Sequence, residues 1–174
     1  ADTHGRKRVF MLGVTLFIAA SAACGLAGSV NWLIAARVLQ AVGAALLTPS
    51  SLSIVLEAFP QSRRAVAVSL WSAVGGLAAA VGPSLGSFVI DAIGWQWAFY
   101  INLPIGAVSL WRGASLLTES APATTRRRVD VVGMALLIVA VGALALAIVQ
   151  ADSPHWQRTD LIAVAATGAL ALVA

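Results

Sequence analysis

Arg37 and Gln40 are the residues whose type and position most clearly indicate chemistry. They lie one helical turn apart inside an otherwise apolar stretch, residues 32–56, that is long enough to cross a bilayer. A charge at the centre of a membrane costs about 2.5–3.5 kcal/mol on insertion scales, so proteins usually keep one for an ion or substrate pathway, or to pair with a buried group. The alternative is structural: Arg37 is near the start of the stretch, where its long side chain can reach the outer interface.

Most of the chain consists of similar apolar stretches, which have to position these two residues. They cover residues 9–30, 32–56, 65–90, 98–118 and 131–150, and a shorter one covers 161–174. A helix needs about 20 apolar residues to cross the hydrocarbon core of a membrane. The sequence therefore predicts an all-α, multi-pass bundle of transmembrane helices, of which the last is truncated.

The composition argues against soluble functions. Hydrophobic residues make up 60% of the chain and charged residues only 10%, whereas a soluble domain has about 25% charged residues. The net charge of +4 comes from short basic runs and not from a basic stripe with interleaved aromatics, so no nucleic-acid partner is expected. We find no nucleophile–base pair, metal-ligand spacing or phosphate-binding loop, so we expect no enzyme activity, no cofactor and no bound metal.

Basic clusters precede the first apolar stretch and then lie in every second gap between the stretches. They lie at residues 6–8, 63–64 and 126–128, whereas the gap at 91–97 contains an acid and no base. Because cytoplasmic loops of membrane proteins are enriched in Lys and Arg, the basic side is assigned to the cytoplasm. The longest gap, residues 119–130, is then a cytoplasmic connector.

Four segments, in order along the chain, resemble signatures of the major facilitator superfamily. Residues 1–8, ADTHGRKR, are similar to the end of its loop signature G-x-L-A-D-R-x-G-R-K-R, and residues 36–45, ARVLQAVGAA, to its signature R-x-x-Q-G-x-G-A-A. Residues 82–86, GPSLG, resemble the G-P-x-x-G-G signature of its antiporters. Residues 94–106, GWQWAFYINLPIG, resemble the start of helix 6 in its fourteen-helix drug:proton antiporters. Three positions depart from these signatures: Thr3, Ala41 and Ser87.

This resemblance implies a partial major facilitator fold. Residues 1–118 would contain helices 3 to 6 of the N-terminal transmembrane half, and residues 131–174 would contain the two helices that follow. Helices 1 and 2 and the C-terminal half are missing from the chain, which starts without Met and stops within an apolar run. We therefore interpret the sequence as an internal fragment.

The loop signature implies a gating cluster at the cytoplasmic end. Its members here are Asp2, Gly5, Arg6, Lys7 and Arg8, and Gly5 permits a short turn between the first two charges. In the family, the aspartate bonds the N-terminus of a helix in the C-terminal half, and the arginine pairs with an acid at the end of helix 4, which here is Glu57. An Arg6–Glu57 pair would hold one access state closed and break in the other. The alternative is that the basic residues only orient the first helix.

The resemblance marks Arg37 and Gln40 as candidates for proton coupling. A guanidinium keeps its own proton, so Arg37 would act by shifting the pKa of a nearby acid or water. Gly82, Pro83 and Gly86 would shape a bend at the interface between the two halves, which in the antiporters is thought to disfavour proton leak. The alternative for these small residues is ordinary close packing of helices.

Together these features predict a secondary active transporter, multi-pass in the bacterial cytoplasmic membrane. Protons moving inward would drive export of drugs or other amphipathic small molecules by alternating access. The expected partners are the lipid bilayer, a small-molecule substrate, protons and the missing C-terminal half of the same chain. Two alternatives stay open: a metabolite or natural-product exporter of the same superfamily, and a truncated membrane component that does not transport.

Overall fold

The computed structural model describes residues 5–117, 131–150, 163–164 and 166–169. The chain divides into two units, Ala1–Thr125 and Arg126–Ala174, and the site described below lies entirely within the first. Several sequence predictions lie outside the described residues: those for Asp2, for the connector 119–130 and for most of the stretch 161–174.

The described residues are largely helical and contain no β-strand. The first unit contains α1 (Arg6–Gly25), α2 (Val30–Ala58), the 3-10 turn η1 (Gln61–Arg63), α3 (Arg64–Ile93), α4 (Trp97–Tyr100) and α5 (Asn102–Leu116), and the second contains α6 (Val131–Val149). In the described part of the chain, α1, α2, residues 61–93 and residues 132–149 are each long and apolar enough to cross a membrane. The predicted all-α membrane fold is confirmed.

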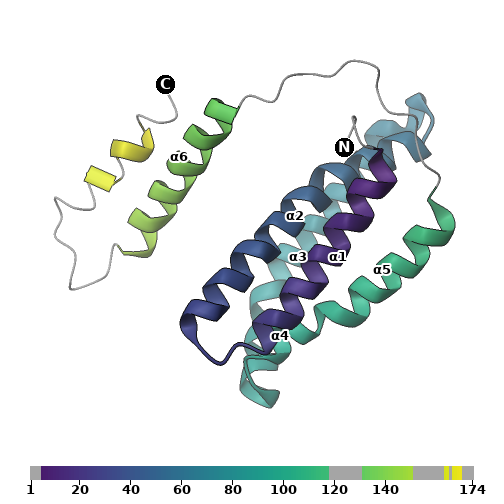
Figure 1. Ribbon diagram of the computed structural model, residues 1–174. Helices are drawn as coiled ribbons and strands as arrows, with labels where there is room; N and C mark the ends of the chain where they lie inside the picture. The colour runs from purple at the N-terminus through teal and green to yellow at the C-terminus, as the bar shows by residue number, and fades with distance from the viewer. Residues whose placement is uncertain (1–4, 118–130, 151–162, 165, 170–174) are drawn as a thin grey trace. The chain divides into compact units, whose positions relative to one another are not determined.

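Helix α1 packs against both α2 and α5 and runs antiparallel to each of them (Figure 1). Glycines bring α1 and α2 into backbone contact: a Cβ added to Gly13 would lie 3.2 Å from the Gly43 carbonyl oxygen, and one added to Gly43 would lie 2.7 Å from the Phe17 backbone nitrogen. Gly106 and Gly113 of α5 likewise face side chains of α1. Small residues permit this close approach in a bilayer, where hydrophobic burial between helices adds little.

The turn between α1 and α2 is longer than the apolar pattern indicated, because α1 ends at Gly25 and α2 begins at Val30. Ser29 caps α2 by accepting a hydrogen bond from the Trp32 backbone nitrogen at 3.3 Å. The Trp32 indole Nε1 in turn donates to the Ala23 carbonyl of α1 at 3.0 Å. These bonds fix the start of α2, and with it the face on which Arg37 lies.

The stretch 98–118, predicted as one span, contains an interruption at Ile101 between α4 and α5. Pro104 lies in the first turn of α5 and has no backbone N–H to donate to the Tyr100 carbonyl, four residues earlier. Proline is tolerated in the first turn of a helix, where such a donor would be unsatisfied in any case. The interruption places Phe99 and Asn102 at a helix junction beside α1.

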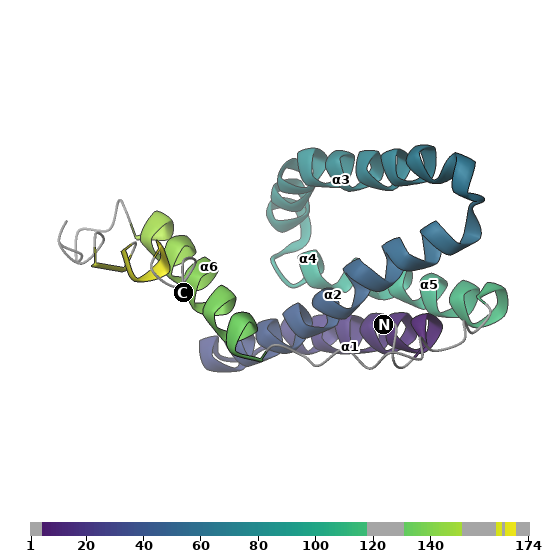
Figure 2. The same cartoon turned by 90° about the horizontal axis from the view of Figure 1, so that it is seen from above.

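Helix α3 contacts α2 and α4, and most of its length stands apart from α1 (Figure 2). Ala67 is its only buried residue in the structure, whereas large apolar side chains such as Val74, Leu77 and Phe88 are about two-thirds exposed or more. Monomeric soluble proteins rarely expose a contiguous apolar surface of this extent to water. The surface of α3 instead suits lipid or further transmembrane helices.

Candidate functional site

The first polar site is built around Arg37 on α2. Its Nη1 donates a hydrogen bond to Gln40 Oε1 at 2.7 Å. The sequence had indicated that these two residues, one helical turn apart, share a face of the helix. The Arg37 guanidinium also lies 5.7 Å from the centre of the Phe99 ring, within the range of a cation–π contact. Gln40 is only 4% exposed, whereas Arg37 is on the exposed side of this unit. The guanidinium therefore lies at the surface of this unit, and the buried Gln40 side chain fixes its position by a hydrogen bond.

The polar chain continues from Gln40 into α1. Gln40 Nε2 donates to Ser21 Oγ at 3.0 Å, and Ser21 is fully buried. The Ser21 hydroxyl donates to the Phe99 carbonyl at 2.9 Å and accepts from Asn102 Nδ2 at 3.0 Å. A single hydroxyl thus joins α1 to α2, α4 and α5. Sequence reasoning singled out neither Ser21 nor Asn102 as a site residue.

Buried polar side chains in the described part of the chain all have hydrogen-bond partners. No buried side-chain nitrogen or oxygen there is left without a hydrogen-bond partner. The same residues include no group of three or more His, Cys, Asp or Glu side chains placed to hold a metal ion. This part of the site can hold a cationic side chain in place, and its hydrogen bonds connect α1 with α2, α4 and α5.

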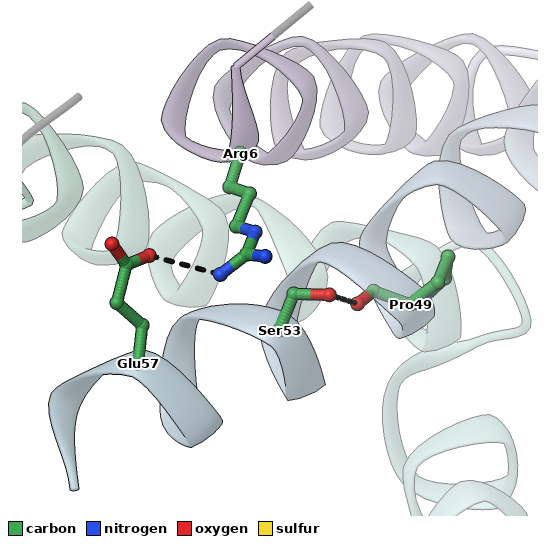
Figure 3. A network of polar contacts seen from close by, with 4 residues as sticks. All are labelled: Arg6, Pro49, Ser53 and Glu57. Atoms are coloured by element: carbon green, nitrogen blue, oxygen red, sulfur yellow. Dashed lines mark hydrogen bonds and ion pairs between the residues drawn. The ribbon is translucent and has the colours of Figure 1, made fainter. Parts of the chain in front are cut away.

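The second polar site lies at the predicted cytoplasmic end of α1, where Arg6 Nη1 and Glu57 Oε2 form an ion pair at 3.2 Å (Figure 3). The contact itself was predicted and is confirmed. Their side chains are 34% and 48% exposed, and such pairs contribute only about 0.2–1 kcal/mol. On the preceding turn of α2, Ser53 Oγ donates to the Pro49 carbonyl at 2.8 Å. A weak, accessible pair of this kind can form and break at little cost.

Lys7 provides a second connection at this end of α1. Its Nζ donates to the Ala114 carbonyl at 2.9 Å and to the Leu117 carbonyl at 2.6 Å, so it caps the C-terminus of α5. Cations are favoured there because the last carbonyls of a helix carry partial negative charge. Gly5, which precedes α1, has a φ of 84°, a conformation that favours glycine. Arg8, also in the loop signature, is exposed.

The Gly82–Pro83–Gly86 signature lies within α3, which continues through Pro83 to Ile93. A Cβ added to Gly82 or Gly86 would meet no atom within 4 Å, and the same holds for Gly75 and Gly76. Among the described residues, none therefore packs closely enough to require glycine at these positions. Their role at an interface between two halves stays a prediction.

Comparisons with known proteins agree with this architecture. The sequence profile described as Major Facilitator Superfamily matches residues 1–174. The chain is 39% identical over 171 residues to the multidrug resistance protein Stp of Mycobacterium tuberculosis, covering 98% of this chain and 32% of that protein. It is 36% identical over 156 residues to the multidrug export protein EmrB of Escherichia coli, covering 90% and 30% of the two chains.

A Streptomyces glaucescens protein, the tetracenomycin C resistance and export protein, is 36% identical over 160 residues, with 92% of this chain and 29% of that protein covered. The chain thus spans about a third of the length of the curated relatives it matches. The family profile covers all of its residues, and four segments of the described part of the chain are long and apolar enough to span a membrane. The chain therefore belongs to the major facilitator superfamily of transporters and is a multi-pass protein of the bacterial cell membrane.

Proposed function

We propose that the transporter containing this chain exports drugs or other amphipathic small molecules, driven by protons that move inward. The observation that carries the proposal is Arg37, a charged residue in an apolar helix whose guanidinium is bonded to the buried Gln40. Proteins retain such a charge at bilayer depth where function requires it. The names of two relatives, a multidrug resistance protein and a multidrug export protein, support the choice of substrate class.

Arg37 would couple transport to protons by its effect on a neighbouring acid. A fixed positive charge favours the ionised form of a nearby carboxyl group and so lowers the pKa of that group. If the helices rearrange and the distance to Arg37 grows, the pKa of the acid rises and a proton binds. The acid would come from another part of the complete transporter.

The contacts at the other end of α1 would stabilise one of the two access states. Arg6 links the start of α1 to the end of α2, and Lys7 links it to the end of α5. We infer that these bonds hold the cytoplasmic ends together in one state and weaken in the other. The small contribution expected of an exposed ion pair fits a contact that has to break in every cycle.

Reversal of the charges in this pair tests the gating role. Arg6→Glu and Glu57→Arg each place like charges in contact, and each is expected to slow efflux by up to about fivefold, as the upper end of the range of exposed-pair energies implies. The double variant restores an opposite-charge pair and is expected to regain most of the loss. Efflux rates are compared at equal amounts of transporter in the membrane. Additive losses in the double variant would exclude the gating role of this contact.

Everted membrane vesicles that contain the complete transporter test the proposal as a whole. Energised vesicles are expected to accumulate a fluorescent lipophilic cation, and an uncoupler that collapses the proton gradient should stop the accumulation. Vesicles without the transporter provide the background. Accumulation that survives the uncoupler, or that requires added nucleotide, would contradict proton-driven export.

A second candidate is export of a natural product, favoured by the Streptomyces relative that is named for tetracenomycin C resistance and export. The same vesicles distinguish the two candidates. Transport of a polycyclic antibiotic without transport of lipophilic cations would favour the second, and transport of chemically unrelated cations would favour the first.

A further inference from the structure

The Ser21 hydroxyl uses its whole hydrogen-bonding capacity. A serine hydroxyl has one proton to donate and two lone pairs with which to accept. The proton goes to the Phe99 carbonyl at 2.9 Å. The two lone pairs receive Gln40 Nε2 and Asn102 Nδ2, each at 3.0 Å. Ser21 is fully buried, so no solvent can replace any of these partners.

This saturation determines the orientation of the Gln40 side-chain amide. If the amide were reversed, its oxygen would face a hydroxyl whose proton is already donated to Phe99, and its NH₂ group would face the guanidinium of Arg37. Both contacts would then lose their hydrogen bond, at a cost that is high in a buried, low-dielectric setting. In the observed orientation Gln40 Oε1 faces Arg37 Nη1 at 2.7 Å.

We infer that Ser21 is a positioning residue for Arg37, acting through Gln40. The inference rests on the proposed function, in which Arg37 couples export to protons. Because the Ser21 hydroxyl takes its other partners from Phe99 and Asn102, the direction of the Arg37 bond depends on the placement of the α4–α5 junction beside α1. A shift of that junction changes the partners of Ser21 and releases the amide that holds Arg37.

A simple packing role for Ser21 makes a different prediction. If the hydroxyl only filled space or stabilised the bundle, its loss would lower every activity of the transporter in proportion to the amount of folded protein. If it positions Arg37, its loss would weaken proton coupling and leave substrate exchange intact. Exchange of substrate across the membrane requires binding and alternating access but no net proton movement.

The experiment uses the complete transporter in vesicles, with a fluorescent lipophilic cation as the probe. Two rates are measured for each variant: efflux driven by the proton gradient, and counterflow of the cation without a gradient. Ser21→Ala is expected to lower the ratio of driven efflux to counterflow about tenfold, the upper end of the effect of losing one buried hydrogen bond, here the one that Gln40 Nε2 donates. Counterflow should stay within about twofold of the unmodified rate.

Ser50→Ala is the matched control, because Ser50 is also fully buried but its hydroxyl bonds the Leu46 and Leu47 carbonyls of its own helix. Its ratio is expected to stay unchanged. If Ser21→Ala does not reach the membrane, Ser21→Cys replaces it, since the thiol keeps an atom in the place of the hydroxyl oxygen and is only a weak donor and acceptor.

The outcomes separate this inference from the proposed function. A lowered ratio in both Ser21→Ala and Arg37→Ala supports the positioning role. A normal ratio in Ser21→Ala, or a parallel fall in efflux and counterflow, overturns it and leaves the role of Arg37 standing if Arg37→Ala is uncoupled. A normal ratio in Arg37→Ala overturns the coupling role of Arg37 and the inference with it.

Discussion

Replacement of Arg37 by alanine is expected to abolish proton-driven efflux while the transporter still reaches the membrane. The substitution removes the positive charge that would lower the pKa of the coupling acid. It also removes the hydrogen bond that Arg37 Nη1 donates to Gln40 Oε1 at 2.7 Å. The cation–π contact with the Phe99 ring is lost as well. Accumulation of a fluorescent cation in energised vesicles should fall to the level seen with an uncoupler.

Two further variants separate charge from geometry. Arg37→Lys keeps the positive charge but lacks the planar, forked donor group, so it is expected to retain only part of the driven efflux. Arg112→Ala is the control for the loss of an arginine from an apolar helix. The Arg112 guanidinium lies 5.5 Å from the centre of the Trp111 ring on α5, and this variant should leave efflux near normal. Normal driven efflux in Arg37→Ala, at an equal amount of transporter, would rule out the coupling role.

Local spacing and charge counting were sufficient to predict some of these contacts. Arg37 and Gln40 are three residues apart, and any α-helix places such residues on one face. The Arg6–Glu57 pair followed from a family pattern and from the presence of one acid at the end of the second apolar stretch. The transmembrane helices followed from hydrophobic length, because a bilayer leaves a spanning segment few alternatives to a helix.

The hub of the first site could not be predicted in the same way. A serine in an apolar stretch commonly bonds a carbonyl of its own helix, as Ser50 does, and no local feature distinguishes Ser21 from it. Its partners Phe99 and Asn102 are 78 and 81 positions away. Only the packing of α4 and α5 against α1 brings them together. Lys7 presents the same difficulty, since a lysine beside a transmembrane helix is expected first as a topological signal.

Glycine patterns were informative about the kind of packing but not about its place. The sequence drew attention to the glycines of 75–86, where an added Cβ would meet no described atom within 4 Å. The close contact is instead between Gly13 and Gly43. The α3 segment and the α1–α2 pair both have small residues on a helix face. Spacing along the sequence alone does not say which of these faces meets another helix and which meets lipid.

Substitution of Gly43 by leucine is accordingly expected to prevent α1 and α2 from packing. Even the first atom of a side chain, a Cβ, would lie 2.7 Å from the Phe17 backbone nitrogen and 2.9 Å from its Cα. A backbone cannot move aside as a flexible side chain does, so Gly43→Ala should already cost about 1–3 kcal/mol, as overpacking of a core does. The gain in helix propensity from glycine to alanine, about 1 kcal/mol at most, does not offset the upper part of this range.

Thermal unfolding of the purified transporter in detergent measures these effects. Gly43→Ala is expected to melt at a lower temperature than the unmodified protein, and Gly43→Leu to yield little folded protein. Gly28→Ala is the matched control, because Gly28 is in the turn that connects α1 to α2 and a Cβ there would meet no atom within 4 Å. The contact also joins the two helices that carry Ser21 and Arg37, so Gly43→Ala should weaken driven efflux as well. Unfolding of Gly43→Leu at the unmodified temperature would show that α1 and α2 do not meet at this glycine.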